Sequence, residues 1–185
     1  MPNEGHLHIK KKLLVAALSV SAFSAVHAAD GTINFTGKVT ADTCTVNNPT
    51  SGTSLNVILP PVSTKSLAGA GTVAGRTPFA ITLRACEGTE VNAAFAIGTD
   101  VDSVTGRLKN TAATAASNVQ IQLVNKDGGQ IDLLTVGSDG TQSGTQWVAM
   151  TGETAVLNYG AEYYATGEAG SGDVNAKIEY TLAYK

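Results

Sequence analysis

The side chains that most often carry out acid–base, nucleophilic or metal chemistry are few and unevenly placed in this sequence. The three histidines, His6, His8 and His27, all precede residue 28 of a chain of 185 residues. The two cysteines, Cys44 and Cys86, lie further along. What this set can do therefore depends on whether the N-terminal segment stays in the mature protein.

The first 28 residues have the pattern of a secretory signal peptide. The basic cluster Lys10–Lys12 is followed by an apolar run over residues 13–26 and by small residues on both sides of His27. The apolar run has about 14 residues, fewer than the ~20 that a helix needs to cross a bilayer, which disfavours a membrane anchor. We predict a signal peptide at 1–28, with cleavage between Ala28 and Ala29.

Removal of this segment would leave no histidine, which excludes Ser-His-Asp and Cys-His catalysis and histidine-containing zinc sites. Two thiols in an exported chain are most simply one disulfide, so we predict a Cys44–Cys86 bond. A metal site would need more ligands than two thiolates, and a redox pair usually has C-x-x-C spacing. Asp100 and Asp102 lack the further oxygen ligands of an EF-hand loop and are interpreted as solvated loop charges. We expect no enzyme activity and no cofactor.

The composition indicates one folded domain that does not bind nucleic acid. Hydrophobic residues make up 43% of the chain, which is enough for a core, and charged residues make up 15%. The formal net charge is −3, whereas nucleic-acid-binding domains carry clustered positive charge.

After the signal peptide, hydrophobic residues recur with a period of two, which is typical of strands. The predicted strands cover residues 79–85, 91–97 and 119–124. The turn Asp127-Gly128-Gly129 predicts a hairpin whose returning strand begins at Ile131. Short strands at this spacing favour an antiparallel β-sandwich. Cys86 falls on the polar phase of its strand, so we expect it just past a bulge or at the strand end.

The two ends of the mature chain alternate most regularly. Residues 174–184 alternate apolar and polar side chains up to the penultimate residue, about twice the mean strand length. Ile33, Phe35, Gly37 and Val39 alternate with polar residues in the same way. Alternation alone leaves two interpretations open. These segments are the first and last strands of an ordinary sandwich, or they are an arm donated to another molecule and an edge that accepts such an arm.

Several motifs spread over the mature chain bear on that choice. They are ADGTINFTGKV (29–39), CTV (44–46), PFAITL (78–83) leading to Cys86, NVQIQL (118–123), YYATG (163–167), Gly172 and the penultimate Tyr184. In this order and spacing they resemble the type 1-like pilins assembled by the chaperone–usher route. The runs LPPVSTK (59–65) and GRTPF (75–79) are similar to major fimbrial subunits of Bordetella type.

The resemblance implies an all-β fold, an incomplete immunoglobulin-like antiparallel β-sandwich that lacks its last strand. A donor strand from a chaperone or a neighbouring subunit would complete it by β-augmentation. The resemblance assigns residues 29–40 as the donor-strand arm and 41–185 as the pilin domain. Ile33, Phe35 and Val39 would fill the groove, and Gly37 would occupy a place too shallow for a side chain.

The same resemblance implies the partners and the location of the chain. The acceptor and chaperone-binding strand would carry Gly172, Val174, Ala176, Ile178, Tyr180, Leu182 and Tyr184. The partners would be a periplasmic chaperone, an outer-membrane usher and identical or related pilin subunits. The expected function is that of a structural subunit of a surface fimbria, exported through the periplasm, which polymerises by donor-strand exchange and supports cell adhesion.

Two other interpretations remain open at this point. The chain could be a minor adaptor pilin, or it could be a secreted carbohydrate-binding β-sandwich. A sugar site would favour exposed aromatic residues, and Trp147, Tyr159, Tyr163 and Tyr164 are the candidates. We expect core packing for most of these four side chains.

Overall fold

The computed structural model describes residues 44–46 and 54–185. Outside the described residues lie the signal peptide predicted at 1–28, its cleavage between Ala28 and Ala29, and the arm residues Ile33, Phe35, Gly37 and Val39. In the part of the chain that the structure describes, no helix has the length and apolar character needed to cross a bilayer.

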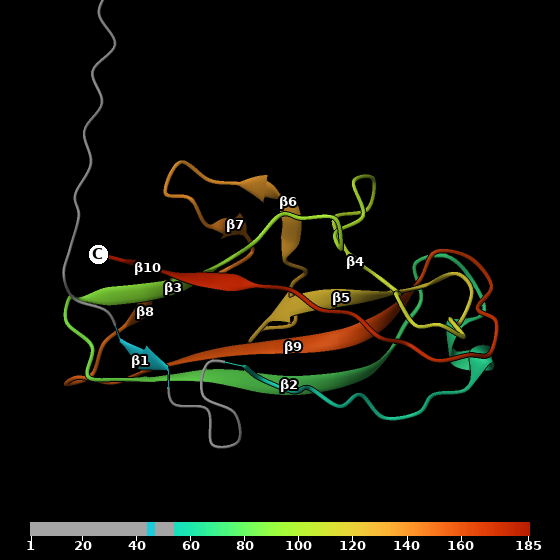
Figure 1. The fold of residues 1–185 in the computed structure, drawn as a ribbon, viewed down its shortest axis with the longest axis horizontal. Coiled ribbons are helices and arrows are strands. Elements are labelled where there is room, and N and C mark those ends of the chain that lie inside the picture. Colours follow the sequence, from blue (N-terminus) through green and yellow to red (C-terminus); the bar gives the residue numbers. More distant parts are fainter. Residues whose placement is uncertain (1–43, 47–53) are drawn as a thin grey trace, which may run out of the picture. The chain divides into compact units, whose positions relative to one another are not determined.

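Short strands dominate the described chain (Figure 1). They are β1 (Thr45–Val46), β2 (Val73–Arg84), β3 (Glu90–Phe95), β4 (Leu108–Lys109), β5 (Val119–Asn125), β6 (Asp132–Val136), β7 (Gln142–Ser143), β8 (Val148–Ala149), β9 (Ala155–Ala165) and β10 (Tyr180–Tyr184). A 3₁₀ turn, η1 (Thr64–Leu67), begins where the Ser63 hydroxyl accepts a hydrogen bond from the Lys65 amide.

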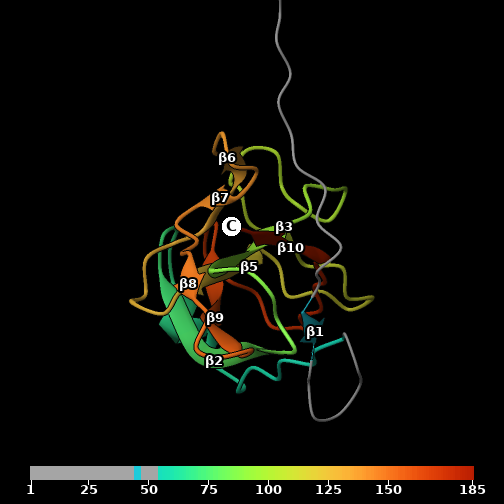
Figure 2. The same ribbon diagram turned by 90° about the vertical axis from the view of Figure 1, so that its left-hand side faces the viewer.

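The strands form three antiparallel sheets, with orders β1-β2-β9-β5-β4, β10-β3-β8 and β6-β7. In Figure 2 β2, β9 and β5 lie on one side of the sandwich, and β3 and β10 lie across from them. The predicted all-β architecture is confirmed.

The core lies between these two sheets, because the alternating apolar side chains of each sheet point inward. Ile81 and Leu83 of β2 and Leu157 of β9 are buried, and Val91 and Ala93 of β3 are buried with them. Full burial of each large aliphatic side chain contributes about 1.5–3 kcal/mol, so this cluster supplies much of the stability.

The predicted disulfide between Cys44 and Cys86 is present and joins two residues that are 42 positions apart in the sequence. β2 ends at Arg84, and Ala85 adopts a left-handed conformation with φ of 50°. This residue breaks the alternation of the strand, so Cys86 turns into the core although it falls on the polar phase. The expectation that Cys86 lies at the strand end is confirmed.

The predicted hairpin after β5 forms only in part. The Asn125 amide donates to the Gly129 carbonyl, and the Ile131 amide donates to the Leu123 carbonyl, so the turn closes as expected. The returning chain then leaves β5, and β6 pairs with β7 instead. Ile131 and Leu133 are both buried in the core, and the chain crosses the sandwich at this point to place them there.

The last strand is shorter than predicted. Only Tyr180–Tyr184 pair with β3, whereas residues 174–179 belong to no strand, although they continue the line of β10 in Figure 1. The reason is that β3 ends at Phe95, so the earlier residues have no neighbouring strand on that side. Gly172 also lies outside the strand to which it was assigned.

Candidate functional site

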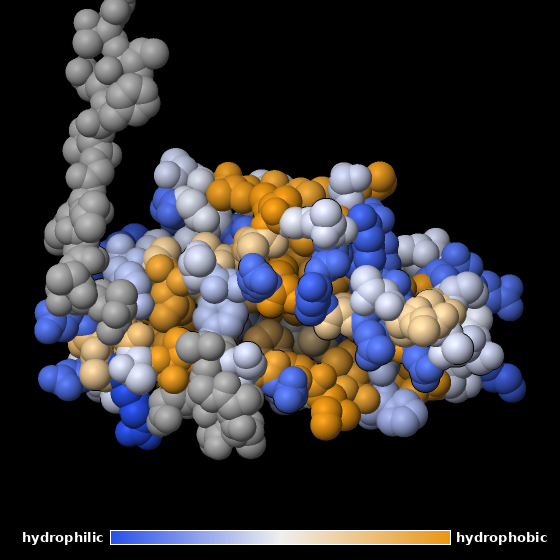
Figure 3. All heavy atoms as spheres, in the orientation of Figure 1, coloured by the Kyte–Doolittle hydropathy of each residue, from blue (hydrophilic) through white to orange (hydrophobic). Residues whose placement is uncertain are grey.

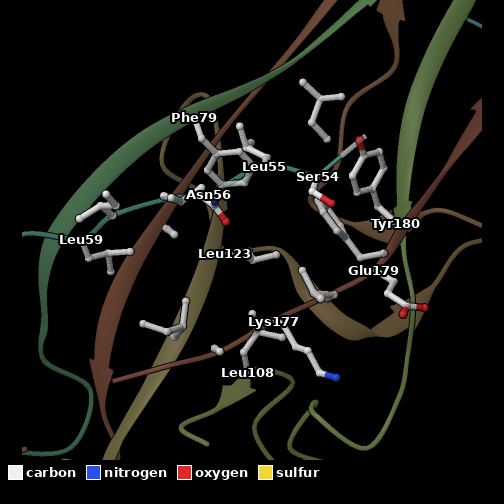
Figure 4. Close-up of a pocket in the computed structure, with 18 of the residues that line it drawn as sticks. Ser54, Leu55, Asn56, Leu59, Phe79, Leu108, Leu123, Lys177, Glu179 and Tyr180 are labelled. Atoms are coloured by element: carbon white, nitrogen blue, oxygen red, sulfur yellow. The ribbon is translucent and has the colours of Figure 1, made fainter. Parts of the chain in front are cut away.

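An apolar groove of about 1090 Å³ runs along one side of the sandwich. Residues 54–59 form one edge of the groove, and residues 174–182 form the other. Its floor is the exposed side of the core, contributed mainly by Phe79, Ile81, Phe95, Leu108, Ile121, Leu123, Ala161 and Tyr163. Figure 3 shows the hollow as a hydrophobic band on the molecular surface, and Figure 4 shows side chains from both edges directed toward it. The predicted open groove beside the last strand is therefore present.

The first edge has the side-chain pattern of a strand without being one. Leu55, Val57 and Leu59 are half-buried and line the groove, whereas Asn56 and Ile58 between them are exposed. Ile58 is 86% exposed. No hydrogen bond joins the backbone of residues 55–59 to any other residue that the structure describes. This edge therefore presents a row of amide and carbonyl groups that another strand could pair with.

The second edge is half paired. The Ala96 amide donates to the Glu179 carbonyl, and the Lys185 amide donates to the Glu90 carbonyl, so these residues direct their backbone groups toward β3. Because backbone groups alternate sides along an extended chain, Ala176 and Ile178 direct theirs away from β3. Within the described chain, neither of these two residues has a backbone hydrogen-bond partner.

The side chains of the second edge reach the core in the predicted alternation except at Ala176, which is exposed. Val174, Ile178, Leu182 and Tyr184 pack against the main hydrophobic cluster, as does Tyr180. Burial raises the pKa of Tyr180 above its ordinary value. An apolar floor between two edges with open backbone groups is suited to one chemical task, the binding of an extended chain whose apolar side chains alternate.

The edge formed by residues 54–59 was missed by sequence reasoning. The alternation of Leu55, Val57 and Leu59 is a signal that could have indicated it. Its interpretation as a strand would still have been wrong, because this segment pairs with no strand that the structure describes.

The acidic loop around Asp100 is structural in the folded chain. Asp102 Oδ1 accepts hydrogen bonds from the amides of Val104 and Thr105, at 3.0 and 2.9 Å. These two hydrogen bonds lower the pKa of Asp102, because they stabilise the carboxylate. The described residues contain no cluster of three or more His, Cys, Asp or Glu side chains suited to a metal ion.

The aromatic residues do not form a common platform. Tyr159 is buried and Tyr163 packs against the core, as expected. Trp147 is not a core residue, because its Nε1 donates to Asp139 at 2.9 Å and the Lys185 ammonium lies 3.9 Å from its ring centre. Tyr164 is half-buried on the opposite face of β9 from Tyr163, with the Arg107 guanidinium 3.6 Å from its ring centre.

Comparison with known proteins identifies the family and the fold. Residues 59–185 match the family described as FimA, type-1 fimbrial protein, A. The chain belongs to this family. It is 49% identical over 162 residues to the major fimbrial subunit SMF-1 of Stenotrophomonas maltophilia, covering 86% of this chain and 95% of that one. It is 41% identical over 182 residues to the F17 fimbrial protein of Escherichia coli, covering 95% and 99%.

The expected likeness to Bordetella fimbrial subunits is also found. This fimbrial protein is 34% identical over 196 residues to FimX of Bordetella pertussis, covering 96% of this chain and 86% of that one. Among solved structures, a type I fimbria protein of Burkholderia pseudomallei is 31% identical, with a TM-score of 0.53 over 83% of this chain and 97% of that one. The P pilus rod subunit PapA, at 20% identity, shares the fold with a TM-score of 0.56 over 77% and 99% of the two chains.

The family match and the relatives establish the class of this protein. The chain is a structural fimbrial subunit of the chaperone–usher class, with an immunoglobulin-like fold that lacks a strand, and it is exported to a cell-surface fimbria. Other pilin subunits are its partners.

Proposed function

We propose that this fimbrial protein polymerises head to tail, with its groove receiving residues 29–40 of another copy. In this arrangement Ile33, Phe35 and Val39 fill the apolar groove, and Gly37 lies where no side chain fits. Burial of three such side chains contributes roughly 5–8 kcal/mol, to which the new backbone hydrogen bonds add. A head-to-tail contact that does not close on itself produces a filament.

The observation that carries this proposal is the groove of about 1090 Å³ between residues 54–59 and 174–182. Its two edges offer backbone groups, and its floor offers apolar surface. The arm supplies the complementary pattern, because its apolar residues recur at every second position. The match concerns both the hydrogen bonds and the side chains, which is what strand addition requires.

The same groove explains the need for a chaperone. An unfilled groove exposes apolar surface and unpaired backbone groups, and such edges promote aggregation. A periplasmic chaperone would therefore supply a temporary strand along residues 174–184, and an outer-membrane usher would exchange it for the arm of the next subunit. The name of SMF-1, a major fimbrial subunit, supports the role of an abundant rod subunit that presents the fimbria for cell adhesion.

The test is the substitution Gly37→Arg in the arm. A long charged side chain at a shallow position combines overpacking with an unpaired buried charge, so this arm should not enter a groove. The subunit should still fold with its chaperone, because the arm is not part of its own core. The measurement is the ladder of SDS-resistant multimers in unboiled surface preparations, and we expect the ladder to disappear.

Thr36→Arg provides the matched control, because it introduces the same charge on the opposite phase of the arm. Its ladder should remain close to that of the wild type. A wild-type ladder with Gly37→Arg would overturn the assignment of the donor strand. Failure of Gly37→Arg to fold even with the chaperone would show instead that the arm belongs to its own sandwich.

A further inference from the structure

A loop at one end of the groove forms hydrogen bonds with the start of the second edge. It lies on the side of this edge that faces away from the groove. We call residues 110–116 the clasp. Asn110 is its first residue, and its Nδ2 donates to the Asp173 carbonyl at 2.8 Å. Its Oδ1 accepts from the Asn175 amide at 3.0 Å. One carboxamide thus joins the loop to Asn175 of the second edge and to Asp173 just before it.

Backbone hydrogen bonds of the residues after Asn110 complete the clasp. The Asp173 amide donates to the Thr114 carbonyl at 2.8 Å, and the Ala116 amide donates to the Asp173 carbonyl at 2.9 Å. The Thr111 amide donates to the Asn175 carbonyl at 2.8 Å. The clasp therefore occupies the place that a longer β3 would have filled.

The approach of the clasp to the edge is close enough to require a glycine. A Cβ built on Gly172 would overlap the backbone of residues 114–116. Any other residue at this position would push the clasp away from the edge. The structure thus gives Gly172 a role in packing the clasp, outside the strand to which the sequence assigned it.

The clasp and β3 contact the second edge from the same side. The clasp contacts it near Asn175, and the end of β3 contacts it near Glu179. Asn175 and Glu179 both direct their backbone groups to that side. Alternation then directs the backbone groups of Ala176 and Ile178 toward the groove. An edge fixed at both ends is ordered before a strand arrives, and the incoming strand does not bear the conformational entropy cost of ordering it.

We infer that Asn110 is a positioning residue for strand addition, because it sets the position of the edge that pairs with the incoming arm. The inference rests on the proposed function of the groove. Asn110 itself need not touch the arm, since it acts from the opposite side of the edge. Its loss should slow strand uptake more than it lowers the stability of the fold.

The experiment measures strand uptake by the mature chain purified in complex with its chaperone. A fluorescent peptide of residues 29–40 is added, and the rate at which it replaces the chaperone is recorded for the wild type and for Asn110→Ala. Asn110→Ala removes the carboxamide hydrogen bonds to Asp173 and from Asn175, together with those inside the loop to Ala116 and from Ala112, so uptake should slow about tenfold. Hydrogen exchange should show weaker protection of the Ala176 and Ile178 amides in the peptide-bound variant.

Asn118→Ala is the matched control. Asn118 also links two loops at this end, through Nδ2 to the Glu168 carbonyl at 2.9 Å, but it makes no hydrogen bond to residues 172–175. Its φ of 57° makes alanine unfavourable there, so the control loses at least comparable stability. Asn110→Asp, which keeps the acceptor oxygen and loses the donor, should be intermediate in uptake.

The outcomes separate the inference from the proposed function. Slow uptake by Asn110→Ala with normal uptake by Asn118→Ala supports the positioning role. Equal rates for Asn110→Ala and the wild type overturn it, as does equal slowing of both alanine variants, which would be an effect of stability alone. Failure of the wild type to take up the peptide overturns the proposed function, and the inference with it.

Discussion

Tyr159 places a titratable hydroxyl inside the sandwich. Its ring packs against those of Phe79 and Phe95, with ring centres 5.8 and 5.4 Å away. The hydroxyl lies 3.4 Å from Oδ1 of Asn92, a residue that is itself fully buried. Burial raises the pKa of Tyr159 to about 12, because the phenolate would lose its solvation there.

This raised pKa predicts a loss of stability in alkali. Between the ordinary tyrosine pKa of about 10 and the folded value of about 12, the unfolded chain releases the proton and the folded chain retains it. The free energy of unfolding should therefore fall across this window, by about 2–3 kcal/mol in total. Tyr159→Phe removes this contribution, so its stability relative to the wild type should improve as the pH rises from 8 to 11.5.

Denaturant unfolding of both proteins across that pH range is the measurement. Phe95→Leu disturbs the same ring cluster without changing a titratable group, and its stability difference from the wild type should not depend on pH. A difference between Tyr159→Phe and the wild type that also stays constant would show that Tyr159 titrates normally.

At the scale of the elements, sequence patterns predicted side-chain direction better than they predicted pairing. Alternation correctly indicated the core-facing residues of β2 and β10. In β3 the polar-phase Asn92 is fully buried as well, and Ile97, expected to continue this strand, lies beyond its end and is 53% exposed. Alternation could not indicate that residues 174–179 lack a ladder, because this depends on where β3 ends. Nor could it indicate that the chain after Ile131 leaves β5, since a period of two is the same whichever strand is the neighbour.

The candidate site was predictable to a similar degree. Its second edge and apolar character followed from the alternation and from the family resemblance. Its first edge at 54–59 was missed although Leu55, Val57 and Leu59 alternate, because three apolar residues without a pairing strand or a turn signal do not mark an edge by themselves. The clasp was unpredictable for another reason, since the hydrogen bonds of Asn110 join residues far apart in sequence.

β10 is the element on which capture by the chaperone should depend. Tyr184 lies opposite Val91 in the β10–β3 ladder, and its hydroxyl accepts a hydrogen bond from the Cys44 amide at 3.1 Å. Tyr184→Ser removes the half-buried ring and should cost about 2 kcal/mol or more. We expect recovery of the subunit with its chaperone to fall sharply, and removal of residues 181–185 to abolish it.

Tyr184→Phe is the control for this prediction, because it retains the ring and loses only the acceptor for Cys44. Its yield in co-purification with the chaperone should approach that of the wild type. An undiminished yield with Tyr184→Ser would mean that β10 is not needed for capture.

At the scale of the whole molecule, the subunit is a sandwich with one side open. The main core is well packed, yet its Phe79, Ile81 and Leu123 side chains also form part of the groove floor. If the groove is filled as proposed, the arm extends the existing core, and polymerisation and the completion of folding are one event. In the proposed role of an abundant rod subunit, every copy gains a neighbour's arm in this way.

Electron microscopy of cells with and without this chain tests that role. Deletion of the gene should remove all filaments of this type, because a rod cannot form without its main subunit. Restoring the intact chain from a plasmid should bring the filaments back. Filaments that are merely shortened, or that lose only their tips, would instead identify the chain as a minor adaptor.

The direction of the groove has a mechanical consequence. A strand seated beside residues 174–182 lies alongside β10, and tension reaches it along the chain that joins it to its own domain. The hydrogen bonds on such a strand are loaded in shear and share the force, whereas bonds pulled sideways would break one after another. The rate of rupture under load would then be set by the kinetic barrier to withdrawing the whole strand. A fibre without covalent links between its subunits can therefore still bear tension.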